Sequence, residues 1–286
     1  MRKRQGGIRL SPLKYPLFVS DIDGTLVTED KKIPVANKES ISAYRDQGGR
    51  FTLATGRSYP EAKPFIEEMD IRLPVILCNG GVLYDPASGH LEATATIERE
   101  ILNRTLRELN QRTDLLDLFV YTLDRVFTTR LSPFSQALLQ SGDFPLELIP
   151  RFEALPEGPW IKLVAVAEPE TMPQLHAWAD TVDDPLEFVQ SSENYFEILP
   201  PRVSKGNALS KLARRYGFAP EQCAAIGDHL NDLSMVKTAG QSAAVANAHP
   251  QLIQAARQIV PSNEEAGVAH FVRQSLLATA PHAQGQ

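Results

Sequence analysis

The sequence is poor in cysteine and has no long apolar run. Its only cysteines, Cys78 and Cys223, lie far apart and have no CxxC spacing. Isolated cysteines of this kind are typical of buried thiols in a reducing compartment, and they offer neither a disulfide framework nor a zinc site. No stretch approaches the roughly 18 apolar residues of a membrane span. No apolar segment follows the basic residues 2–4, so we expect no secretory signal, no membrane contact and a cytoplasmic protein.

An excess of positive charge is also lacking. The net charge is −6, which argues against nucleic acid as a partner because such binding normally needs a basic domain. A negative net charge does not exclude a phosphorylated substrate, since a few local cations can reverse the potential inside one cleft. The 286 residues, of which 43% are hydrophobic, suit two domains or one domain with an insert. The sequence does not indicate whether the protein is a monomer or an oligomer.

Several common catalytic motifs are missing. The chain contains no GxxxxGK(S/T), HExxH or GxSxG pattern. An ordinary P-loop ATPase, a zinc protease of that type and a serine hydrolase of the α/β type each lack their defining residues here.

Short apolar runs alternate with helical segments near both ends of the chain. Runs without alternation suit strands buried on both faces, so we predict an α/β fold with a Rossmann-like, doubly wound parallel-sheet core. The expected core strands cover residues 17–20, 51–54, 75–78, 196–199 and 223–226, with weaker candidates at 243–246 and 258–260. The expected core helices cover residues 34–47, 60–69, 204–216, 231–238 and 264–278.

The character of the chain changes after about Tyr84, where we predict an inserted α+β cap domain. Its expected elements are helices over 97–112 and 170–180, a hairpin over 119–129 that turns near Asp124, a loop over 146–159 and a strand over 160–167. The predicted organisation is a mobile tail (1–14), a core (15–83 and 194–279), a cap (84–193) and a second tail (280–286).

Four polar clusters follow predicted strands of the core. Ligands of open parallel sheets bind outside the carboxyl ends of the strands. Any one cluster could be a helix cap, but four in this arrangement predict a site. They are Asp21, Asp23 and Thr25; Thr55, Gly56 and Arg57; Lys205 and Gly206; and Asp228, Asn231 and Asp232.

The charges of these clusters call for a cation. Four aspartates in one site would repel one another, and a phosphate would add up to two more negative charges, against Lys205 and Arg57. Oxygen ligands without a cysteine or histidine pattern favour Mg²⁺, which also prefers to bind beside a substrate phosphate.

The clusters resemble the motifs of the haloacid dehalogenase-like superfamily, and more narrowly those of its Cof-type (subfamily IIB) phosphatases. The resemblance covers nearly all of residues 15–275. The four clusters match the four family motifs in order, and smaller echoes occur at 79–81, 245–248 and 263–268. His229 departs from the small or polar residue often found at its place, and its role is open.

The resemblance implies a role for each matching residue. Asp21 would be the nucleophile and a metal ligand, and Asp23 would be the general acid and base, with its backbone carbonyl on the metal. Asp228 would complete the ligands, supported by Asp232 and Asn231. Thr55, Lys205 and the amide of Gly56 would hold the phosphoryl oxygens, and Asn231 and Arg57 are further candidate phosphate contacts. The expected reaction is Mg²⁺-dependent hydrolysis of a small phosphorylated metabolite, such as a sugar phosphate, nucleotide or phosphorylated cofactor.

Alternatives stay open at this point. A phosphotransferase or phosphomutase of the same fold would share the motifs, and so would a phosphate-ligand sensor without catalysis. The cap should read the leaving group, with Tyr121, Trp160, Lys162, Glu193, Asn194 and Tyr195 as possible contacts. Structural interpretations are favoured for these: Trp160 as core, Lys162 as a strand surface residue, and Glu193 with Asn194 as a hinge loop.

Overall fold

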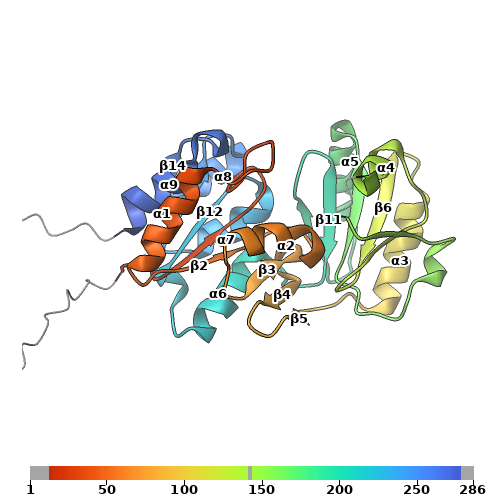
Figure 1. Cartoon of the computed structure of the whole chain (residues 1–286). Coiled ribbons are helices and arrows are strands. Elements are labelled where there is room, and N and C mark those ends of the chain that lie inside the picture. The colour runs from red at the N-terminus through yellow and green to blue at the C-terminus, as the bar shows by residue number, and fades with distance from the viewer. Residues whose placement is uncertain (1–12, 141–143, 278–286) are drawn as a thin grey trace, which may run out of the picture.

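The computed structural model describes residues 13–140 and 144–277. Of the two predicted tails, residues 1–12 and 280–286 lie outside this range. The described chain forms two parts, each built around its own sheet, which lie side by side in Figure 1.

A five-stranded parallel sheet forms the centre of the first part, as predicted. Its strand order is β14-β13-β12-β1-β2. All carboxyl ends of a parallel sheet lie at one edge, where the predicted clusters meet. The strands are β1 (Leu17–Ser20), β2 (Arg50–Leu53), β12 (Cys223–Gly227), β13 (Gln241–Val245) and β14 (Gln258–Val260).

Helices cover both faces of this sheet. Alternate residues of β1 pack on opposite sides: Phe18 lies in the cluster that contains Tyr44 of α1 and Phe271 of α9, and Leu17 lies in the cluster that contains Leu209 of α6. The doubly wound core is therefore confirmed. Its helices are α1 (Val35–Asp46), α2 (Tyr59–Glu68), α6 (Lys205–Arg215), α7 (Leu233–Thr238), α8 (Pro250–Ala255) and α9 (Gly267–Phe271).

The third predicted strand leads into a small antiparallel sheet beside the core. This sheet has the order β3-β4-β5, and its link to the end of β2 is the parallel bridge between Ala54 and Ile76. The chain therefore stays with the core past Tyr84 (Figure 1). The strands are β3 (Val75–Leu77), β4 (Val82–Asp85) and β5 (His90–Ala93).

The second part is a six-stranded mixed sheet with the order β10-β11-β9-β6-β7-β8. The predicted hairpin is confirmed, because β6 and β7 pair antiparallel. The segment expected as a loop contains β8, which pairs parallel with β7; its Pro and Gly residues follow the strand rather than precede it. The elements are α3 (Arg99–Asn110), β6 (Leu115–Tyr121), β7 (Val126–Thr128), α4 (Pro133–Gln140), β8 (Leu146–Leu148), β9 (Lys162–Ala167), α5 (Met172–Ala179), β10 (Glu187–Gln190) and β11 (Tyr195–Leu199).

Strand β11 corrects the sequence interpretation. The segment 196–199 was expected to return the chain to the core, but β11 pairs antiparallel with β9 and β10 inside the mixed sheet. Its residues 196–199 are buried because both faces of this sheet are covered, so the strand carries the same unbroken apolar pattern as a core strand. We propose domain boundaries near residues 95 and 200.

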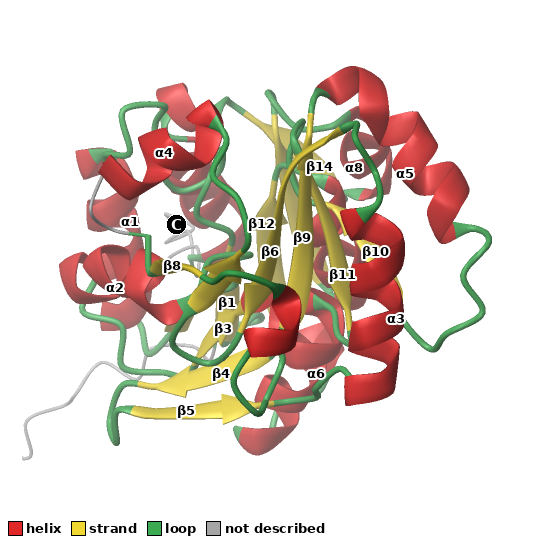
Figure 2. Cartoon of the chain, turned by 90° about the vertical axis from the view of Figure 1, so that its right-hand side faces the viewer, coloured by secondary structure: helices red, strands yellow, loops and turns green. Residues whose placement is uncertain are grey.

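The two faces of the mixed sheet differ. Leu163 and Ala165 of β9 pack in the cluster that contains Leu106 of α3 and Leu175 of α5. Val164 and Val166 point the other way and join the cluster shared with the core. Figure 2, viewed from the cap side, shows α3 and α5 with this sheet. Within the described ranges, no helix is long and apolar enough to cross a membrane.

Candidate active site

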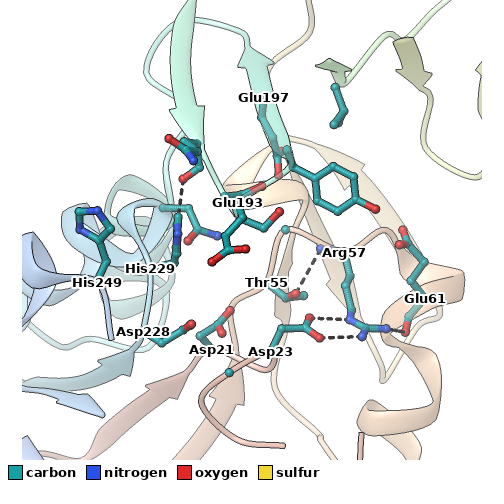
Figure 3. A pocket seen from close by; sticks show the side chains of 18 of the residues that line it. Asp21, Asp23, Thr55, Arg57, Glu61, Glu193, Glu197, Asp228, His229 and His249 are labelled. Atoms are coloured by element: carbon teal, nitrogen blue, oxygen red, sulfur yellow. Dashed lines mark hydrogen bonds and ion pairs between the residues drawn. The ribbon is translucent and has the colours of Figure 1, made fainter. Parts of the chain in front are cut away.

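A cavity of 960 Å³ lies where the mixed sheet meets the carboxyl edge of the parallel sheet. The predicted site residues that line it are Asp21, Asp23, Thr55, Gly56, Arg57, Asp228 and Asn231. Figure 3 shows Asp21, Asp23 and Asp228 in one row, with Glu193 of the cap above them. The remaining predicted residues, Lys205 and Asp232, do not line the cavity and are buried beside Asp21.

Lys205 joins two of the aspartates. Its Nζ lies 2.6 Å from Asp21 Oδ1 and 2.6 Å from Asp232 Oδ1. It sits at the first residue of α6, whose preceding residue, Ser204, caps the helix by accepting from the Asn207 amide. Asp232 in turn accepts backbone N–H bonds from the loop that carries Asp228. The lysine is fully buried, so this network fixes Asp21 at the end of β1.

Asp21, Asp228 and Asp232 form a cluster that could hold a metal ion. Each offers one carboxylate oxygen, and the three atoms lie within 4.8 Å of one another. Burial and the neighbouring carboxylates outweigh Lys205 and raise the pKa of Asp21 to about 7. Burial and Asp21 also raise the pKa of Asp228 well above its ordinary value. The donor set thus has more negative charge than Lys205 balances, and a hard divalent cation fits it.

Close backbone packing admits Asp228 to this cluster. Gly24 has φ +68°, and a Cβ there would lie 2.4 Å from Asp228 Oδ2, so the turn after β1 requires glycine for both its conformation and its space. Thr25 donates to Asp228 Oδ1 at 3.1 Å. The turn that carries Asp21 therefore also orients Asp228.

Asp23 points away from the metal cluster. Its carboxylate accepts two hydrogen bonds from Arg57, at 2.7 and 2.8 Å, and one from Lys31 at 2.8 Å. Burial opposes ionisation, but Arg57 and Lys31 prevail and hold the pKa of Asp23 well below its usual range. The sequence analysis missed Lys31, a loop residue eight positions after Asp23 that no motif marks. Arg57, which the sequence analysis predicted to contact phosphate, is hydrogen-bonded to Asp23.

Three polar side chains that follow β2, β3 and β12, those of Thr55, Asn79 and Asn231, keep unused hydrogen-bonding atoms within the described chain. The Thr55 hydroxyl accepts from the Arg57 amide at 3.1 Å. Asn231 donates to Asn79 Oδ1 at 3.0 Å, while Asn231 Oδ1 and Asn79 Nδ2 are buried without a partner in the described parts of the chain. Buried unpaired amide atoms are uncommon away from binding sites. The sequence analysis noted Asn79 as a family echo and gave it no role.

Some of the expected cap residues reach the cavity and others do not. Tyr121, Lys162, Glu193 and Tyr195 line it. Two do not: Trp160 is buried in the hydrophobic cluster under α3, as expected, and Asn194 donates to Ala167 O within the cap. The expectation that Lys162 is a surface residue is wrong: it is 2% exposed and paired with Glu197. Its alternation on β9 puts it on the face toward the core.

His229 contributes a contact between the two parts. Its Nδ1 lies 3.1 Å from Gln190 O at the end of β10, and its ring packs edge-on to His249 at 5.6 Å. Burial lowers the pKa of His229, which favours the neutral ring. The residue that departs from the expected motif thus lies between the core loop and the cap, where Figure 3 shows it at the cavity wall.

The fold and the site together define a class: a doubly wound α/β core with a carboxylate cluster at the carboxyl edge of its parallel sheet, and an inserted mixed-sheet cap beside it. Residues 18–272 match the family described as haloacid dehalogenase-like hydrolase. The chain belongs to this family, and the predicted Cof-type phosphatase assignment is confirmed.

Two phosphatases and a solved structure that are similar to the chain agree with this assignment. The chain is 29% identical to the 5-amino-6-(5-phospho-D-ribitylamino)uracil phosphatase YwtE of Bacillus subtilis, over 90% of this chain and 96% of that protein. It is also 29% identical to the HMP-PP phosphatase of Yersinia enterocolitica, over 94% and 97%. A haloacid dehalogenase-like hydrolase structure from B. subtilis superposes with a TM-score of 0.82 at 25% identity, covering 91% of this chain and 100% of the other.

Proposed function

We propose that the protein hydrolyses phosphomonoesters of small metabolites through an aspartyl-phosphate on Asp21, with Mg²⁺ as its cofactor. One observation carries the proposal: the Asp21 carboxylate lies buried at the cavity floor, between Lys205 and the Asp228 side of the cluster, with Asp23 two residues further on. A nucleophile, a cationic side chain and a second carboxylate thus lie close together at the carboxyl end of β1.

In the first half-reaction an Asp21 oxygen attacks phosphorus, and the bond from phosphorus to the leaving oxygen breaks. Asp23 gives a proton to that oxygen, and in the second half-reaction it takes one from the water that attacks the aspartyl-phosphate. Phosphate leaves, and the Asp21 carboxylate is restored. Thr55, the Gly56 amide and Lys205 would hold the phosphoryl oxygens, on which negative charge develops. Thr55 and Gly56 line the cavity, and Lys205 is paired with Asp21 at its edge.

Asp21, Asp228 and the backbone carbonyl of Asp23 would hold Mg²⁺, with Asp232 and Asn231 supporting them. The bound ion would supply charge neutralisation for the carboxylates and the phosphoryl group. Asp23 has a further requirement. Arg57 and Lys31 hold it ionised, so an incoming phosphate must draw part of their charge before Asp23 can carry a proton.

The cavity favours a neutral, hydroxyl-rich leaving group. Glu61, Glu193 and Glu197 line it along with Tyr121 and Tyr195. Among the described lining residues, the cations Lys31, Arg57 and Lys162 are each paired with a carboxylate, so a second phosphate would meet no unpaired cation there. We therefore infer that the substrate is a polyol phosphate. It would be closer in character to the ribitylamino compound in the YwtE name than to the compound in the name of the HMP-PP phosphatase.

A cytoplasmic location stays a prediction.

The test is hydrolysis of p-nitrophenyl phosphate with Mg²⁺ and with EDTA. We expect the wild type to turn over only with metal and Asp21→Asn to be inactive. Asp46→Asn is the matched control, an exposed aspartate at the end of α1, and should keep full activity. Full activity in Asp21→Asn would contradict the nucleophile assignment. Transfer of phosphate to added alcohols in place of water would indicate the phosphotransferase alternative.

A further inference from the structure

The cap buries a charged pair that the reaction described above does not use. Lys162 of β9 and Glu197 of β11 lie 2.7 Å apart, with side chains 3% and 4% exposed. Removing two charges from water has a large desolvation cost, and apolar replacements of such pairs are often neutral or stabilising. Fold stability alone therefore does not account for this pair.

Lys162 also reaches across to the core. Its Nζ donates to Gly56 O at 2.8 Å and lies 4.5 Å from the centre of the Tyr121 ring. Gly56 belongs to the loop after β2 and lines the cavity. A Cβ at Gly56 would lie 3.2 Å from Glu197 Oε1, so the glycine lets the cap carboxylate approach the loop closely.

The contacted peptide group leads directly to Thr55. The carbonyl of Gly56 and the amide of Arg57 belong to the same peptide, and that amide donates to Thr55 Oγ1 at 3.1 Å. Accepting this bond leaves the hydroxyl hydrogen of Thr55 available, and among the described residues it has no acceptor. A cation on the carbonyl end of a peptide strengthens donation from its N–H end.

We propose that Lys162 is a positioning residue: from the cap, it fixes and polarises the Gly56–Arg57 peptide so that the Thr55 hydroxyl is held as a donor to the phosphoryl group. Glu197 keeps the lysine in place. The Gly56 carbonyl has its contact with Lys162 only when the cap lies against the core. Leaving-group binding in the cap and phosphoryl binding in the core therefore become coupled. This inference rests on the proposed phosphatase function.

Kinetics of Lys162→Met test the proposal. We expect kcat to fall by about 10- to 100-fold, the range found when groups that orient a site residue are removed, with little change in KM. Lys211→Met, which removes an exposed lysine of α6, should leave both constants unchanged. The double variant Lys162→Met/Glu197→Leu removes the whole pair and avoids a lone buried carboxylate; it should unfold near the wild-type temperature and still show the low kcat.

A second arm asks whether the effect passes through Thr55. In a Thr55→Val background, Lys162→Met should lower kcat by no more than about twofold, because residues that act as one unit are not additive. A full additional loss there, or recovery of kcat in the double variant of the pair, would overturn the proposal.

A third arm does not depend on activity. Hydrogen exchange of the Arg57 amide, followed by NMR, should be faster in Lys162→Met than in Lys211→Met; equal rates would overturn the proposal. If Asp21→Asn is fully active, the proposed function fails, whereas this exchange result still judges the role of Lys162. If Asp21→Asn is inactive and Lys162→Met has normal kcat and exchange, the inference alone fails.

Discussion

Lys205 in the core and Lys162 in the cap are both buried, yet their surroundings differ. Lys205 has two carboxylate partners, Asp21 and Asp232, with Asp228 close by. Lys162 has one carboxylate partner and a peptide carbonyl. The first environment has surplus negative charge and fits a metal ion, while the second is balanced. The core lysine thus belongs to the charge chemistry of the site, and the cap lysine to its geometry.

The largest expected effect comes from comparing the two lysines directly. Lys205→Met should lower kcat by about 10²–10³-fold or more, the range for loss of a group that stabilises transition-state charge. Lys162→Met should cost less, because it acts through Thr55. Parallel steady-state assays of the two variants and Lys211→Met check this order. A smaller loss for Lys205→Met than for Lys162→Met would reverse the comparison.

The turn at Gly24 should be nearly as sensitive. Gly24→Ala places a Cβ against Asp228, so it should displace the cluster, lower activity by about 10²-fold and weaken the response to Mg²⁺. Gly48→Ala is the matched control: its φ is +88°, but a Cβ there meets nothing within 4 Å. It should cost only the ~1–2 kcal/mol of a left-handed residue and keep its activity. Equal activity in the two variants would contradict the close-packing argument.

Surplus charge in the core predicts a pH-dependent effect of metal on stability. The pKa of Asp21 is raised from 3.8 to about 7, and burial is the largest cause. Because the folded protein holds this proton more tightly than the unfolded chain does, the carboxyl lowers stability as the pH rises from about 4 to about 7. Mg²⁺ should relieve this, so it should raise Tm more at pH 7.5 than at pH 5.5. Asp21→Asn should lose most of that difference, and an equal Mg²⁺ effect at both pH values would argue against the cluster.

The smallest effect is expected at the mouth of the cavity. Glu193 is exposed and has no paired cation within the described chain. Glu193→Ala should raise KM for a polyol phosphate by about fivefold, equivalent to the ~1 kcal/mol of a typical net hydrogen bond, with kcat unchanged. Glu168→Ala, at an exposed cap position away from the cavity, should leave KM as it is. A fall in KM would indicate an anionic leaving group instead.

The same contrast explains what the sequence could predict. The residues Asp21, Thr55, Lys205 and Asp228 follow short apolar strands or open a helix, and parallel pairing of the core strands brings their ends to one edge. Local patterns therefore predicted residues that the fold brings together. Lys205 was predicted as a site residue although the strand before it was wrongly assigned to the core sheet. That strand, β11, pairs within the cap sheet.

The cap contacts could not be predicted in this way. A strand buried by a second domain has the same apolar pattern as a core strand, so β11 could not be told apart. The burial of Lys162 depends on Glu197, 35 positions later, and on the core loop, and nothing local marks either partner. Lys31 was missed for the same reason: its partner Asp23 is brought near by loop geometry, which no spacing rule encodes.

The most direct test of the account is to trap the covalent intermediate. A ³²P-labelled phosphomonoester would be mixed with enzyme and Mg²⁺, quenched in acid within one turnover, and the labelled peptide located by mass spectrometry. The account predicts hydroxylamine-labile label on Asp21 of the wild type and none in Asp21→Asn. Rapid turnover with no label on the wild type, together with an active Asp21→Asn, would contradict it.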